Sequence, residues 1–155
     1  MRCRARTLRS LLLAAVCAGG VHADELKRNP FDDPFVEVTA GLAGCPVPEV
    51  PMFTDEQYRA EAHDRAQRGV SCWMAGRCRL HSAYLYDKEI IPRVKTAILV
   101  DGRFADTSVS VLGQRRWVIL KGCVRTDAQK KALAALVRGI DDVEAVVDEL
   151  SVRKR

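Results

Sequence analysis

The fold of this 155-residue chain is decided by residues 108–124, which read SVSVLGQRRWVILKGCV. Serine and valine alternate over residues 108–111, and a two-residue period of this kind is typical of a half-buried strand. Residues 113–115 then predict a hairpin connection, and residues 116–124 predict the second strand. The centre of the fold is therefore expected to be a β-hairpin.

An amphipathic helix is predicted directly before this hairpin, over residues 87–99. Its apolar side chains recur at helical spacing and form one stripe: Ile90, Ile91, Val94, Ala97 and Ile98. Asp87 is expected to cap the helix, and Pro92 falls in its early turns, where a proline is tolerated.

A second helix and a last strand are predicted after the hairpin. Thr126 and Gln129 form a capping box that opens the helix, and Gly139 is its expected stop. Spaced valines and a leucine predict the strand over residues 143–152. The order α-β-β-α-β predicts an α+β domain, with a three-stranded sheet and both helices on one face.

The ordered set of apolar positions in residues 87–152 resembles the BON domain, the bacterial osmotic-shock and nodulation module. The matching positions are Ile90, Val94, Ala97, Ile98, Val118, Leu120, Gly122, Val124, Val143, Val146, Asp148, Leu150 and Val152. Arg116 and Asp142 stand where the family usually has glycine, and Asp148 stands where it usually has asparagine. The resemblance implies a single, non-catalytic, envelope-associated module that binds phospholipid or supports membrane integrity under stress.

The domain is preceded by an extension over residues 24–86. Five prolines make residues 24–53 read as irregular. Thr54 and Gln57 form a capping box that predicts a helix over residues 54–68, with Gly69 as its stop. Residues 70–86 are too apolar for a free linker, so a cysteine-clipped turn packed on the domain is expected.

Four cysteines remain after the N-terminal segment: Cys45, Cys72, Cys78 and Cys123. An even number in an exported chain favours two disulfides, with four buried thiols or a zinc site as the alternatives. The spacing from Cys72 to Cys78 is too wide for a zinc knuckle. Cys72 and Cys78 are expected to close a local loop, which leaves Cys45 for Cys123.

Strand parity supports a link between Cys123 and the extension. Val118, Leu120, Gly122 and Val124 fall on the face that the helices cover, so Trp117, Ile119, Lys121 and Cys123 fall on the other. Trp117 and Ile119 are poor solvent residues, and a free exposed cysteine is hazardous in an oxidising compartment. The extension and residues 70–86 are therefore expected to cover this second face.

Residues 1–23 read as a secretory signal. Four arginines without an acid precede the apolar run LLLAAVCA, and VHA ends the segment at Ala23. A short membrane anchor and lipid attachment at Cys17 are the alternatives, but the run is too short to span a bilayer. We therefore expect a periplasmic or secreted protein, cleaved near Ala23.

The charge balance argues against a nucleic-acid partner. Loss of the four arginines lowers the net charge from +5 to +1. Residues 24–86 then carry a net −3 and residues 87–155 a net +4, which is no dense basic patch. Aromatic residues make up only 6% of the chain, too few for a large base-stacking surface.

The chain shows no motif that requires an enzyme. No nucleophile–base pair, phosphate loop or set of metal ligands stands out, so no catalytic residue, metal or cofactor is predicted. Instead, a contact with anionic phospholipid is predicted at the hairpin tip and the opening helix, through Arg115, Arg116, Trp117, Lys88, Arg93 and Lys95. The alternatives are a solvated hairpin and a module that binds an envelope protein or cell-wall component. A disulfide redox protein is a remote alternative.

Overall fold

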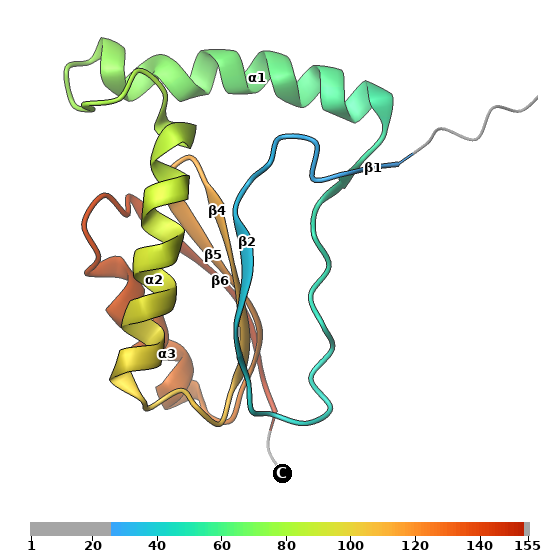
Figure 1. Ribbon diagram of the computed structural model, residues 1–155, viewed down its shortest axis with the longest axis vertical. Helices are drawn as coiled ribbons and strands as arrows, with labels where there is room; N and C mark the ends of the chain where they lie inside the picture. The colour runs from blue at the N-terminus through green and yellow to red at the C-terminus, as the bar shows by residue number, and fades with distance from the viewer. Residues whose placement is uncertain (1–25, 154–155) are drawn as a thin grey trace, which may run out of the picture.

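The computed structural model describes residues 26–153 (Figure 1), so the predicted signal segment and its cleavage near Ala23 lie outside the described residues. The elements are β1 (Lys27–Arg28), β2 (Phe35–Ala40), β3 (Met52–Phe53), α1 (Asp55–Met74), the 3-10 helix η1 (Ala83–Tyr86), α2 (Asp87–Asp101), β4 (Ser108–Gln114), β5 (Trp117–Val124), α3 (Asp127–Arg138) and β6 (Ala145–Val152). From α2 onward they confirm the predicted order α-β-β-α-β.

The main sheet has four strands in the order β2-β4-β5-β6, so the prediction of three strands is wrong. β2 comes from the extension and pairs antiparallel with β4, β5 continues the hairpin, and β6 pairs parallel with β5. The prolines of residues 24–53 predict an irregular segment here. Pro34 and Pro46 lie outside β2, however, and six residues are enough for an edge strand that places Val36 and Val38 against the core.

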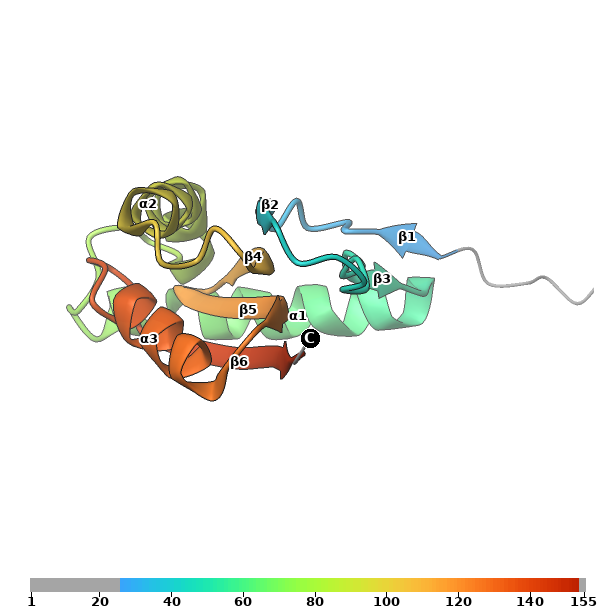
Figure 2. The same ribbon diagram turned by 90° about the horizontal axis from the view of Figure 1, so that it is seen from below.

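α2 and α3 cover the same face of this sheet, as predicted (Figure 2). Each strand of the hairpin sends alternate side chains into the core beneath the helices, and α2 adds its predicted stripe. The fully buried members include Ile90, Ile91, Val94, Val109, Val111, Val118, Leu120, Val124, Leu133 and Val137. The two-residue and helical periods of the sequence therefore identify most of the core, but Ala97 of the predicted stripe is only partly buried and lines an open depression on α2.

The hairpin turns at Arg115 and Arg116, whereas the predicted connection was residues 113–115. Gln114 pairs with Trp117 across a two-residue turn. Both arginines have positive φ, 59° and 65°, the conformation that such turns require and that usually selects asparagine or glycine. Gly113 lies inside β4 instead, where a Cβ atom would lie 2.7 Å from the Cγ1 atom of Ile91. This glycine allows α2 to approach the sheet closely and does not form the turn.

Helix α1 is longer than predicted. Thr54 and Gln57 form both hydrogen bonds of the predicted capping box. The helix then continues past Gly69, the expected stop, to Met74. Gly69 is buried because Ser82 packs against it, and a Cβ atom there would lie 2.7 Å from the hydroxyl oxygen of Ser82. This glycine therefore serves helix packing and not helix termination.

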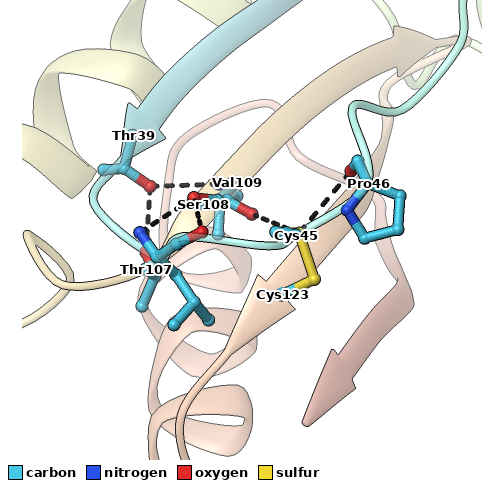
Figure 3. Close-up of a disulfide and its surroundings, with 8 residues drawn as sticks. Thr39, Cys45, Pro46, Thr107, Ser108, Val109 and Cys123 are labelled. Atoms are coloured by element: carbon cyan, nitrogen blue, oxygen red, sulfur yellow. Dashed lines mark hydrogen bonds between the residues drawn. A yellow bond between two sulfur atoms is a disulfide. The ribbon is translucent and has the colours of Figure 1, made fainter. Parts of the chain in front are cut away.

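Both predicted disulfides are present. One joins Cys45 to Cys123 and the other joins Cys72 to Cys78. The first ties the segment after β2 to the end of β5, on the face away from the helices (Figure 3). Next to it, the backbone N–H of Leu42 donates to the hydroxyl oxygen of Ser108 at 3.0 Å.

The extension covers only part of the second sheet face. Pro46, Pro48 and Glu49 line a depression over the ends of β5 and β6, near Lys121. Trp117 at the other end of β5 remains partly exposed. Residues 70–86 do not lie there, because Cys78 and Leu80 pack against the main core. The expectation that both segments cover this face is therefore correct for the first and wrong for the second.

Candidate functional site

The six residues predicted to contact lipid do not form one surface. Trp117 lies on the sheet face away from the helices, and the guanidinium of Arg115 stacks on its ring at 4.9 Å. The other predicted basic residues, Lys88, Arg93 and Lys95, lie on α2, on the opposite side of the sheet (Figure 2). The sheet therefore separates Trp117 from the basic residues of α2, whereas Arg116 of the turn and Arg93 of α2 both bind Asp142.

Arg116 is held against the fold by contacts of its side chain. Its Nε donates to the backbone oxygen of Asp142 at 2.9 Å, and its guanidinium lies 5.1 Å from the ring centre of Tyr86. Its Nη1 lies 3.2 Å from the sulfur of Cys78. Only 19% of the side chain is exposed. The sequence showed a basic tip but could not show that one of the two arginines turns inward.

Asp87 explains how two arginines adopt the turn. This buried carboxylate was expected to cap α2, but it accepts the backbone N–H groups of Arg115 at 2.6 Å and Arg116 at 2.7 Å. Burial raises the pKa of Asp87 to about 6, although both hydrogen bonds act in the opposite direction. Asp87 therefore joins the start of α2 to the hairpin tip.

The outer face of α2 combines basic and apolar side chains, and we call it the α2 surface: Lys88, Pro92, Arg93, Lys95, Thr96, Leu99 and Val100. Pro92, Arg93, Thr96 and Val100 share an open depression. Leu99 is 51% exposed and Val100 is 80% exposed. Neither residue is among the predicted contacts, although both lie off the buried stripe of the helix.

The carboxylates near the α2 surface form ion pairs with basic side chains. Glu89 pairs with Arg79, and Asp101 pairs with Arg103. Lys88 and Arg93 also have partners: the Nζ of Lys88 lies 3.1 Å from a carboxylate oxygen of Asp32, and an Nη of Arg93 lies 3.0 Å from one of Asp142. The ion pair of Lys88 is mostly exposed on both sides, so it contributes little to stability and can exchange for another anion.

An α+β domain whose helices leave a basic and apolar strip exposed has the features of a surface-binding module. The described residues include no helix long and apolar enough to cross a membrane. Residues 86–154 match the family model described as BON domain, in a single copy, so this part of the chain is a BON domain. BON domains are generally non-catalytic and are linked to phospholipid binding and the cell envelope. No curated protein matches the chain.

Proposed function

We propose that this protein binds anionic phospholipid at a membrane surface of the cell envelope, with the α2 surface as its contact. The observation that carries the proposal is the exposure of Leu99 and Val100, one turn along the helix from Lys95. In the free domain these two large aliphatic side chains are exposed to water, which is unfavourable. At the boundary between headgroups and acyl chains they would be stabilised.

The basic residues of the α2 surface supply attraction to the headgroups. A lysine or arginine near an anionic leaflet contributes about 1 kcal/mol. Lys95 forms no ion pair within residues 26–153, and Lys88 is mostly exposed. The helix would therefore lie in the plane of the interface, with its basic side chains toward phosphate and its aliphatic side chains toward the acyl chains.

We also propose that the protein acts outside the cytoplasm, in the periplasm or as a secreted protein. The features of residues 1–23 support export, and two disulfides are typical of an oxidising compartment. Export with cleavage after Ala23 requires a mature chain that begins Asp24-Glu25-Leu26. N-terminal sequencing tests this, and a start at Cys17 or retention of Met1 would refute it.

Co-sedimentation with vesicles tests lipid binding. Wild-type protein should sediment with vesicles that contain phosphatidylglycerol and stay in solution with pure phosphatidylcholine. Lys95→Glu and the pair Leu99→Ser with Val100→Ser should each weaken binding. Lys131→Glu is the matched control, because it reverses an equally charged, exposed residue of α3. If wild-type protein ignores anionic vesicles, lipid binding is refuted and a protein or cell-wall partner becomes the better interpretation.

A further inference from the structure

A short loop outside the BON domain exposes two large apolar side chains. Residues 73–77 comprise the end of α1, with Trp73 and Met74, and the turn that follows it. The Cys72–Cys78 disulfide closes this segment, which we call the clipped loop. Trp73 is 52% exposed and Met74 is 74% exposed. Within residues 26–153 these are two of the nine large apolar side chains left exposed, and they are neighbours in the sequence.

The backbone of the clipped loop is held by hydrogen bonds and by the disulfide. The backbone N–H groups of Gly76 and Arg77 donate to the carbonyl oxygens of Trp73 and Cys72, both at 2.9 Å. Gly76 has a φ of 68°, which reverses the chain at low cost. Cys72 itself is buried. The disulfide and these bonds present Trp73 and Met74 to solvent, and a preorganised loop loses little entropy on binding.

The charged side chains of the segment that contains the clipped loop are all basic. Residues 65–86 contain four arginines and no aspartate or glutamate. Arg65, Arg68 and Arg79 pair with carboxylates from outside that segment, Asp33, Asp64 and Glu89. Arg77 lies within the clipped loop, is exposed, and has no ion pair to any carboxylate in the part of the chain that the structure describes. An anionic surface is therefore complementary to the loop.

We propose that the clipped loop is a second membrane contact, which docks on anionic phospholipid with Trp73 and Met74 at the interface and Arg77 beside the phosphates. The inference rests on the proposed function, but it assigns a contact to the extension rather than to the BON domain. Tryptophan favours the headgroup level of a bilayer because its ring is apolar and its N–H is polar. A methionine beside it adds flexible apolar area, and the arginine adds charge.

Fluorescence tests this contact directly, because the chain has only two tryptophans. In Trp117→Phe protein, Trp73 is the sole reporter. Vesicles that contain phosphatidylglycerol should shift its emission to the blue and protect it from acrylamide, while phosphatidylcholine vesicles should do neither. Trp73→Phe protein is the matched control, in which Trp117 reports from the second sheet face.

Sedimentation of a second variant separates the two proposed contacts. Trp73→Ser with Met74→Ser should weaken binding to anionic vesicles about tenfold, without loss of the far-ultraviolet circular dichroism of the folded protein. If the protein sediments with anionic vesicles but Trp73 emission and binding by this variant are unchanged, the clipped loop is refuted and the α2 surface stands. If Trp73 shifts while the α2 variants bind normally, the α2 surface is refuted and the clipped loop stands. No sedimentation at all refutes both.

Discussion

The carboxylate of Asp87 lies 2.7 Å from the backbone nitrogen of Arg116, and this buried contact joins the first residue of α2 to the tip of the central hairpin. Arg116 occupies a position where BON domains usually have glycine, and its φ of 65° shows why. A non-glycine residue in this conformation costs about 1 kcal/mol or more. Asp87 and the inward guanidinium of Arg116 offset that cost.

The first prediction concerns the pH dependence of stability through Asp87. Its pKa is raised from 3.8 to about 6 in the folded protein, so the folded state holds this proton more tightly than the unfolded state. The contribution of Asp87 is therefore most favourable below pH 4 and is lost as the pH rises through 6. The total change is on the order of 3 kcal/mol.

Urea unfolding of wild-type and Asp87→Asn protein at pH 4, 5, 6 and 7 measures this effect. The free energy of unfolding of wild-type protein, relative to the variant, should fall from pH 4 to pH 7. A difference that stays constant across this range, or that grows with pH, would contradict the assignment of the raised pKa to Asp87.

The second prediction compares the two arginines of the turn. Arg115→Gly removes an unfavourable φ and loses only the stacking on Trp117, so it should change the free energy of unfolding by less than about 1 kcal/mol in either direction. Arg116→Gly also loses the hydrogen bond to Asp142 and the contact with Tyr86. It should destabilise the protein by about 1–2 kcal/mol despite restoring the usual glycine. Equal effects in urea unfolding would show that the guanidinium of Arg116 contributes nothing.

The parts of the fold that were predicted correctly depend on local signals. Alternation located the central strands, the capping box located the start of α1, and the even cysteine count with strand parity led to the pairing of Cys45 with Cys123. The sequence does not predict β2, because its buried Val38 and partly buried Val36 lie in a proline-rich segment. A six-residue edge strand needs only a proline-free run that can pair with the free edge of another strand.

The candidate site was harder to predict because it depends on tertiary contacts. Composition and position alone made Arg115 and Arg116 equivalent, yet one stacks outward on Trp117 and the other turns inward to Asp142. Lys88, Arg93 and Lys95 were correctly placed on one helix, but their separation from Trp117 by the sheet could not be seen from residue spacing. Leu99 and Val100 could have been found, since neither falls on the buried stripe of α2.

The third prediction concerns the Cys45–Cys123 disulfide, which closes a loop of 78 residues. In the chain-entropy account such a cross-link stabilises the folded state by about 4–5 kcal/mol. Cys45→Ser with Cys123→Ser should therefore lower the free energy of unfolding by several kcal/mol. It should also increase hydrogen exchange in β2, since the bond anchors the segment that follows this strand (Figure 3).

The Cys72–Cys78 disulfide provides the matched comparison. It spans only six residues, so the pair Cys72→Ser with Cys78→Ser should cost about 2 kcal/mol. Exchange in β2 should stay at its wild-type rate in this second variant. A larger loss from the short loop than from the long one would overturn the ranking.

The last prediction concerns the open edge of the sheet at β6, where Asp148 replaces the usual asparagine. A carboxylate oxygen of Asp148 accepts the backbone N–H of Leu150 at 3.0 Å, and the Nζ of Lys130 donates to the backbone oxygen of the same residue at 2.6 Å. Side chains thus occupy both backbone groups of Leu150, which hinders pairing of a strand from another molecule at this point of the edge.

Asp148→Ala should free the N–H of Leu150, lower the free energy of unfolding by about 1 kcal/mol, and promote association at high protein concentration. Asp148→Asn is the control, because its amide oxygen can still accept this N–H and only the ion pair with Lys130, at 3.4 Å, is lost. Urea unfolding and light scattering measure the two effects. The edge-blocking role of Asp148 is wrong if the alanine and asparagine variants have the same stability and both stay monodisperse.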